Sequence, residues 1–291
     1  MATTRSRSLR RAAAIACAAN AAVWGVRPLT PKLVYTVQEP KAGDKVVVDS
    51  QTKLRWQQQV SATKVSHSAA AAACQDSAYG GHDDWRLPSR AELSSFIDFA
   101  AASPPLIDTV AFPATPKDWH WAATPIAGSA NQFWDVHFGA GHINYYLGSG
   151  TNFARCVRAM GSYDFPELRF VVSAGGGIVT DVWLQREWQR DVAPTILHVG
   201  GAIPYCKGLT LEGKVGWRLP TVRELEGLVD VKLTGVTLSA AAFPNAPAKH
   251  VWTGTIQSVD NSMDWWVNFQ IGTVGFTGNA TANHVRCTRE P

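Results

Sequence analysis

Cysteine is the residue type in this chain with the widest range of possible chemistry, since it can form disulfides, bind metals or attack substrates. Cys74 and Cys206 occur in one repeated context, and Cys156 and Cys287 in another. No Cys-x-x-Cys or Cys/His spacing supports zinc, and no cysteine stands with an activating base. The pattern favours a disulfide from Cys74 to Cys156 and another from Cys206 to Cys287, over metal ligation or catalysis. Such bridges need an oxidising compartment.

Other catalytic signatures are missing from the sequence. The eight histidines have no metal-ligand spacing, and the glycines at 175–177 lack the Lys-Ser/Thr ending of a phosphate-binding loop. Glu92 and Glu224 each follow a helix-capping residue, Ser89 or Thr221, by three positions, so we interpret them as capping boxes rather than acid catalysts. The sequence therefore predicts no enzyme, no catalytic residue, no metal and no cofactor.

The elements that position these residues occur twice. The tetrad Trp-Arg-Leu-Pro lies at 85–88 and again at 217–220, a shift of 132 residues, and the matches continue on both sides. A period of this length is too long for a solenoid repeat and fits a small domain. We predict two tandem homologous domains, with Arg86 and Arg218 buried in hydrogen-bond networks to backbone carbonyls. The residues expected to be structural are Trp85, Arg86, Leu87, Pro88 and Glu92, with Trp217, Arg218, Leu219, Pro220 and Glu224.

Each copy is predicted to begin with a strand pair and to end in aromatic strands. The pairs are 32–37 with 46–49 and 169–172 with 178–181. A helix precedes the first cysteine of copy one, whereas Gly200, Gly201 and Pro204 predict a short, late or distorted helix in copy two. The alternating strand residues expected to face inward are Trp134, Val136 and Phe138, and Trp265, Val267 and Phe269.

The candidate ligand-binding residues are side chains that differ between the copies. On the alternating strands, some polar and aromatic residues point opposite to the core set, toward solvent or a groove. Exposed aromatic rings stack on the C–H faces of sugars while neighbouring polar groups bind hydroxyls. The candidates are Trp119, His120, Asp135, His137, Trp266 and Asn268, and a plain solvated face is the alternative interpretation.

The N-terminus carries the whole charge imbalance of the chain. Arg5, Arg7, Arg10 and Arg11 account for the formal net charge of +4 and precede an Ala-rich run over 12–26. This order is typical of a secretory leader, with a disordered basic tail or a transit peptide as alternatives. Without these arginines the chain offers no bulk charge for nucleic acid. We expect a membrane anchor only if Cys17 is lipidated. The predicted division is 1–26 leader, 27–31 linker, 32–160 first domain, 161–165 linker and 166–291 second domain.

Several motifs in combination resemble one known family. They are the tetrad followed by Glu-Leu, the lead-in from Asp49 to Trp56, the Trp-x-Val-x-Phe strand and the closing Arg-Cys-x-Arg. Together they resemble the Legionella collagen-like protein C-terminal (Lcl C-terminal) domain family, which looks like a distant branch of the C-type-lectin-like and sulfatase-modifying group. The resemblance implies two tandem α+β domains, each with short helices and a twisted antiparallel sheet tied by one disulfide.

The resemblance also implies a range of functions. Better-known members are surface or secreted bacterial proteins, so we expect a secreted, periplasmic or cell-surface protein that recognises a glycan or a cell-surface partner. A calcium-bridged sugar site is not supported, because the Glu-Pro-Asn type of loop is missing beside Trp134-Asp135 and Trp266-Val267-Asn268. The alternatives are a structural component of the cell envelope and, third, a formylglycine-generating enzyme, which would need a reactive Cys156 or Cys287.

Overall fold

The computed structural model describes residues 35–50, 52–158 and 169–291. The predicted leader, Cys17 and both predicted linkers lie outside these residues. The first copy contains β1 (Tyr35–Lys41), β2 (Asp44–Asp49), β3 (Arg55–Gln57), α2 (His67–Gln75), η1 (Tyr79–Gly81), α3 (Arg90–Ser94), β4 (Trp119–Pro125), β5 (Gln132–His137), β6 (His142–Leu147) and β7 (Val157–Arg158). The second contains β8 (Phe170–Val172), β9 (Ile178–Asp181), β10 (Arg186–Gln189), α4 (Val199–Gly208), α5 (Val222–Glu226), β11 (His250–Ile256), β12 (Met263–Asn268), β13 (Thr273–Gly278) and β14 (Thr288–Arg289).

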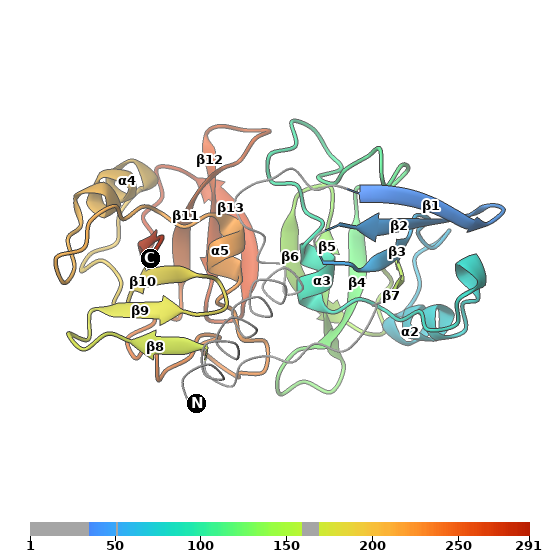
Figure 1. Ribbon diagram of the computed structural model, residues 1–291, viewed down its shortest axis with the longest axis horizontal. Helices are drawn as coiled ribbons and strands as arrows, with labels where there is room; N and C mark the ends of the chain where they lie inside the picture. The colour runs from blue at the N-terminus through green and yellow to red at the C-terminus, as the bar shows by residue number, and fades with distance from the viewer. Residues whose placement is uncertain (1–34, 51, 159–168) are drawn as a thin grey trace, which may run out of the picture.

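One antiparallel sheet runs through both copies. Its strand order is β11-β12-β13-β6-β5-β4, and each copy adds a four-stranded sheet of its own, β1-β2-β3-β7 or β14-β10-β9-β8 (Figure 1). The two halves of the large sheet meet where Ile143 of β6 pairs with Val274 of β13. These residues occupy the same position in the two copies, 131 residues apart. A pair of equivalent residues defines a pseudo-twofold axis, so the domains associate as two subunits of an isologous dimer would.

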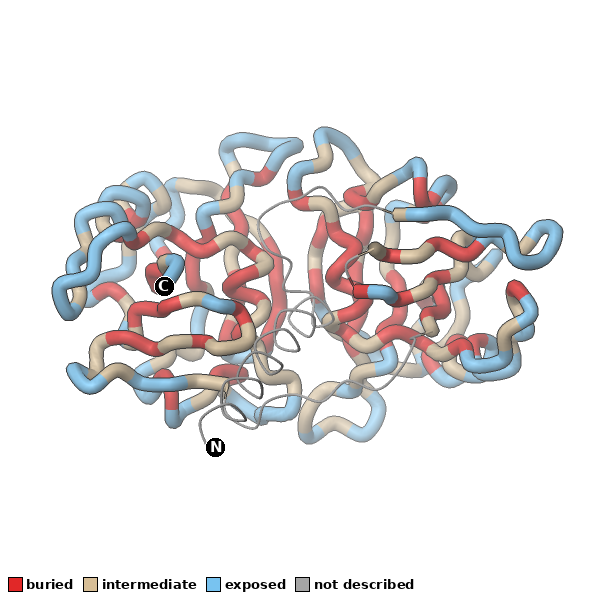
Figure 2. Tube along the Cα trace, in the orientation of Figure 1, coloured by how far each residue is buried: buried red, intermediate tan, exposed pale blue. Residues whose placement is uncertain are grey.

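The predicted capping boxes and the alternating strands are both confirmed. In α3 and α5 the side chain of Ser89 or Thr221 accepts from the backbone N–H of the glutamate, whose own carboxylate accepts from the cap's N–H. Trp134, Val136 and Phe138 are buried, as are their counterparts in β12 and just beyond it. These side chains belong to one apolar cluster that continues from the first domain into the second. Figure 2 shows the buried segments gathered along the inner strands of both halves.

The helix before the second domain's early cysteine was expected to be short, late or distorted, and of these three only a local irregularity, at Pro204, is found. It is neither short nor late, because α4 has 10 residues and α2 has 9, and both begin at the equivalent position. Pro204 lies inside α4 and has no N–H to donate to the carbonyl of Gly200, one turn earlier. Both residues are exposed, so water can hydrogen-bond the carbonyl that Pro204 leaves without its usual donor.

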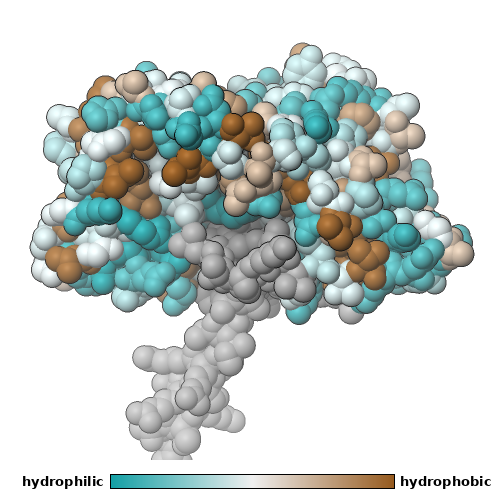
Figure 3. Space-filling model, turned by 90° about the horizontal axis from the view of Figure 1, so that it is seen from above, coloured by the Kyte–Doolittle hydropathy of each residue, from teal (hydrophilic) through white to brown (hydrophobic). Residues whose placement is uncertain are grey.

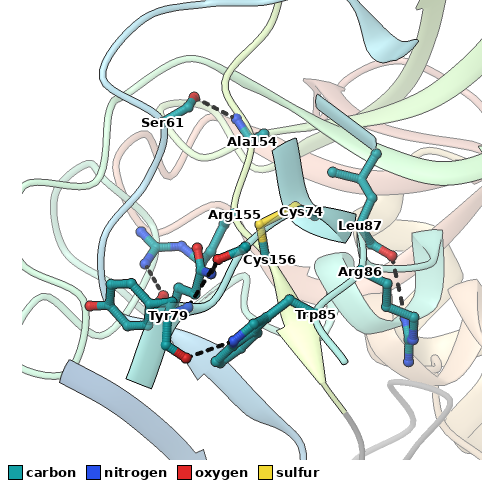
Figure 4. Close-up of a disulfide and its surroundings, with 11 residues drawn as sticks. Ser61, Cys74, Tyr79, Trp85, Arg86, Leu87, Ala154, Arg155 and Cys156 are labelled. Carbon is teal, nitrogen blue, oxygen red and sulfur yellow. Dashed lines mark hydrogen bonds between the residues drawn. A yellow bond between two sulfur atoms is a disulfide. The ribbon is translucent and has the colours of Figure 1, made fainter. Parts of the chain in front are cut away.

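Disulfides join Cys74 to Cys156 and Cys206 to Cys287, with sequence separations of 82 and 81. Each bridge ties the helix α2 or α4 to the residue just before the last strand of its domain. Figure 4 shows the first bridge beside Trp85, whose indole N–H donates to the carbonyl of Tyr79 at 2.9 Å. The first long helix of each domain is therefore linked covalently to its last strand.

The arginines of the tetrad do not occupy the predicted environment. Arg86 donates to the Leu87 carbonyl at 3.3 Å, but its main partner is the capping carboxylate of Glu92, at 2.8 and 2.6 Å, and its side chain is partly exposed. Arg218 repeats this with Glu224. The buried arginine that binds backbone carbonyls is instead Arg155, which donates to Gln57 and Gln58, and its counterpart Arg286. The predicted network of hydrogen bonds to backbone carbonyls therefore exists, but Arg155 and Arg286 form it rather than Arg86 and Arg218.

A buried ion pair holds the two domains together on the core side of the sheet. The guanidinium of Arg90 lies 2.9 Å from the carboxylate of Glu226 and donates to the Gly272 carbonyl at 2.8 Å. Ser94 donates to the same carboxylate at 2.9 Å. Ser94 and Glu226 are equivalent residues of the two copies, so this cluster also lies on the pseudo-twofold axis.

Two equivalent glycines let the domains approach each other closely. A Cβ on Gly141 would lie 2.8 Å from the ring of Trp265, and one on Gly272 would lie 3.0 Å from the ring of Trp134 and 2.9 Å from Val229. Both glycines have positive φ, 72° and 74°. Trp265 of the second domain thus packs against the turn before β6, and Trp134 of the first domain packs against the turn before β13.

We expect Gly272→Ala to lower the free energy of unfolding by about 2–3 kcal/mol, from left-handed strain plus overpacking against Trp134. Urea denaturation measures the loss. Gly235→Ala is the matched control, because Gly235 has φ 81° and nothing within 4 Å of its Cβ position, so only the strain of about 1 kcal/mol applies. Equal losses in the two variants would show that the close approach between domains contributes nothing.

Candidate ligand-binding surface

The six candidate residues all lie on the six-stranded sheet. Trp119 and His120 are on β4, Asp135 and His137 on β5, and Trp266 and Asn268 on β12. We call the face opposite Trp134 and Trp265 the outer face; it carries Phe133, Asp135 and His137 of β5 and Asp264, Trp266 and Asn268 of β12. The helices α2 and α4 pack on the outermost strands, β4 and β11. The stacking of His67 from α2 on Phe133, at 3.4 Å, places α2 over this face.

His120 is a correction to the candidate set. It is completely buried beside Phe138, 4.8 Å between ring centroids, and its Nδ1 lies 3.0 Å from the Asp118 carbonyl oxygen. It is paired with Val136, so it belongs to the core side of the sheet. Burial lowers the pKa of His120 to about 3, and the nearby Arg155 acts in the same direction. The side chain is therefore a neutral core histidine.

Asp135 is the second correction. It points to the outer face as predicted, but it is only 3% exposed, because it lies beside Trp121 where α2 packs. Its Oδ2 accepts from the Asn152 amide at 3.0 Å, and its Oδ1 has no hydrogen-bond partner among the described residues. Burial raises the pKa of Asp135 to about 7, against the opposing effect of the Asn152 hydrogen bond. Strand alternation gave the direction of this side chain but not its burial against Asn152.

The other four candidates remain partly exposed, in one cluster per domain. In the first domain the ring of Trp119 meets the ring of His137 edge-on, with centroids 4.8 Å apart. Nδ1 of His137 accepts from the Ala140 N–H at 2.9 Å. Burial lowers the pKa of His137, with the Asp118 carboxylate opposing the shift. Lys64 neutralises Asp118 at 2.5 Å, so this cluster presents little net charge.

The second domain's cluster contains a histidine that the sequence analysis missed. His250 stacks on Trp266 with centroids 4.0 Å apart and planes 15° from parallel. It is paired with Asn268, whose Oδ1 accepts from the Gln270 N–H at 2.8 Å. The signal was available, because His250 is the counterpart of Trp119 and Asn268 the counterpart of His137. Burial lowers the pKa of His250, and Lys249 adds to the effect.

Sequence reasoning also missed two exposed side chains of β6, Asn144 and Tyr146. Both lie on the outer face, since they are paired with Asp135 and Phe133. Their counterparts in β13 are Gly275 and Thr277, so comparison of the copies marks them as different. The ring of Trp266 lies over Gly275, and a Cβ on Gly275 would come within 2.6 Å of that ring.

Metal-binding groups and cysteines are the first features to examine among the described residues. Within them, no group of three or more His, Cys, Asp or Glu side chains is placed to hold a metal ion. The four described cysteines are all in disulfides. None of the helices in residues 35–50, 52–158 and 169–291 is long and apolar enough to cross a membrane. Seen from above, the surface is largely hydrophilic with separate apolar patches (Figure 3).

Fold and surface define a class of protein: two homologous, disulfide-bonded α+β domains that share one sheet and leave an aromatic and amide surface on it. The family model of the Lcl C-terminal domain matches residues 45–158 and again 177–289. The chain therefore belongs to the Lcl C-terminal domain family and carries two copies of its domain in tandem. No curated protein matches the chain.

We expect Asp135→Asn to remove a pH dependence of stability. Because the folded-state pKa is raised from 3.8 to about 7, the wild-type free energy of unfolding should fall as pH rises between these values. At pH 8 the variant should be more stable than wild type by about 2 kcal/mol, with a smaller difference at pH 4. Urea denaturation at both pH values tests this. Asp83→Asn, on an exposed carboxylate, is the control. A wild-type stability that is flat from pH 4 to 8 would contradict the prediction.

Proposed function

We propose that this chain is an exported bacterial binding or adhesion protein that is not an enzyme and that recognises a glycan or a cell-surface partner. The observation that carries the proposal is the outer face around Trp266, where an indole ring stacked by His250 lies next to the Asn268 amide. Aromatic rings beside planar hydrogen-bonding groups suit sugars, whose rings have apolar C–H faces and hydroxyl edges.

The disulfides support the exported location. Bridges of this kind persist in oxidising compartments, which is consistent with a secreted, periplasmic or cell-surface protein. They also weigh against a formylglycine-generating enzyme, since Cys156 and Cys287 are both bonded to partners. Membership of the Lcl C-terminal domain family supports a role at the bacterial surface. We include in the proposal that each domain is a C-type-lectin-like variant.

A glycan array and a pull-down on whole cells, both with oxidised protein, test the proposal. Trp266→Ala should weaken binding by about tenfold or more, in line with the loss of an aromatic contact at an interface. Trp183→Ala is the matched control, because Trp183 packs against Arg169 at 5.0 Å, away from the outer face. If native protein binds in neither assay, the proposal fails. Polymers that form without any ligand would favour the structural role in the envelope.

A further inference from the structure

The pairing of β6 with β13 joins the outer faces of the two domains into one surface. Ile143 lies opposite Val274 in an antiparallel pairing, so the next residues along the two strands on the outer face are Asn144 and Thr273, of which Thr273 is 6% exposed. Thr273 is in turn paired with Asn268 of β12. Residues directly opposite each other point to the same side of a sheet, so Asn144, Thr273 and Asn268 form one row across the domain boundary.

An aromatic ring lies on each side of this row. Tyr146 is two residues further along β6 from Asn144, and Trp266 is two residues along β12 from Asn268 in the opposite direction. With ordinary strand dimensions the two rings are about 16 Å apart, on a diagonal that crosses the boundary between the domains. Tyr146 is 54% exposed, and its ring lies over Gly150, where a Cβ would come within 2.2 Å. Trp266 lies over Gly275 in the same manner.

Neither domain contains this arrangement alone. Tyr146 and Asn144 belong to the first domain, and Asn268 and Trp266 to the second. Their counterparts in the opposite copy are Thr277, Gly275, His137 and Asp135, so the pseudo-twofold axis does not generate a second such diagonal. The surface is therefore a single feature of the two-domain chain.

The four side chains that would contact the ligand carry no formal charge, and the nearest carboxyls, Asp135 paired with Asn144 and Asp264 two residues from Trp266, are acidic and do not attract an anion. The four are two amides, an indole and a phenol. The histidines nearest to them, His137, His142 and His250, all have pKa values lowered by burial. Rings, amides and neighbouring carboxyls do not compensate a sulfate or carboxylate, but the rings can stack on sugars and the amides can pair with hydroxyls.

We infer that Tyr146, Asn144, Asn268 and Trp266 form one composite site, which binds a single uncharged, unbranched glycan chain across the two domains. The inference rests on the proposed function and names its ligand class and its stoichiometry. Tyr146 and the part of the Trp266 ring that His250 leaves uncovered would contact sugars near the ends of the bound segment, and the amides would bind hydroxyls between them. A ligand of this kind engages both domains at once.

Calorimetric titration with neutral hexasaccharides of glucose, mannose and N-acetylglucosamine, each compared with its sulfated form, tests the inference. We expect one hexasaccharide per chain and tighter binding of a neutral form. Asn144→Ala and Asn268→Ala, one in each domain, should each weaken binding about tenfold without changing the stoichiometry. Asn261→Ala, in the exposed turn between β11 and β12, is the control and should bind normally.

Three results would overturn the composite site while leaving the proposed function intact. They are two sites per chain, tighter binding of a sulfated form, and loss of binding in only one of the two asparagine variants. Binding of a cell-surface protein in the pull-down, with no response to any hexasaccharide, would have the same meaning. Native protein that binds neither cells nor any glycan would overturn the proposed function itself.

Discussion

Arg90→Met is expected to lower the free energy of unfolding by about 3–5 kcal/mol, because it leaves a buried carboxylate without its cation. Arg90 and Glu226 are 3% and 4% exposed, and their charged groups lie 2.9 Å apart. The guanidinium also packs over the ring of Trp134 at 4.5 Å and donates to the Gly272 carbonyl. Methionine retains much of the apolar stem but none of these polar contacts, so the cost falls on the junction between the domains.

Urea denaturation of the oxidised protein measures this loss. Lys41→Met is the surface control: Lys41 pairs with Asp44 at 3.9 Å in an exposed position, and we expect a change below about 0.5 kcal/mol. The double variant Arg90→Met/Glu226→Leu should recover most of the lost stability, because no charge is then left uncompensated. If Arg90→Met costs less than about 1 kcal/mol, the ion pair does not stabilise the junction.

The parts of the fold that the sequence predicted depend on short-range patterns or on the repeat itself. Ser89 and Glu92 identify a capping box within four residues, and alternation along β5 is enough to place Trp134 inside. The cysteine pairs followed from their equivalent positions in the two copies. Each of these inferences needed only one segment, or one segment compared with its copy.

The junction could not be predicted in this way, because it depends on how two copies meet in space. Arg90 and Glu226 are neighbours only across the axis, and each has an unlike counterpart, Val222 and Ser94. These differences mark the positions as special, but nothing in the sequence says that they touch. The pairing of Ile143 with Val274 is hidden for the same reason, since both look like ordinary core positions.

The candidate site was predicted in part for a related reason. Strand alternation gives the face on which a side chain lies, and it correctly placed His137, Trp266 and Asn268 on the outer face. It does not say which part of that face other segments cover, so Asp135 was taken as accessible although it is 3% exposed and accepts from the Asn152 amide. Asn144 and Tyr146 were overlooked because β6 gains its importance only from its pairing with β13.

Replacing Cys74 and Cys156 with alanine is expected to lower the free energy of unfolding by about 4 kcal/mol. The bridge closes a loop with a sequence separation of 82, and its removal restores that conformational freedom to the unfolded chain. Cys74 is fully buried against the tetrad's Trp85 and Leu87, so alanine at this position also leaves a small gap. Urea denaturation without reductant measures the effect.

The second bridge provides a matched comparison. Cys206→Ala/Cys287→Ala opens a loop with a separation of 81, so its cost should be nearly the same, and reductant added to native protein should remove both contributions. If either of the two double-cysteine variants loses less than about 1 kcal/mol of unfolding free energy, the chain-entropy argument is contradicted.

Loss of both bridges would remove about 8 kcal/mol, most of the 5–15 kcal/mol by which a protein is ordinarily stable. We therefore expect the wild-type chain to accumulate in folded form when it is expressed in an oxidising compartment and to be degraded or aggregated in a reducing one. Equal yields of folded protein from the two compartments would show that the packed junction alone is sufficient. The disulfides would then say little about where this protein works.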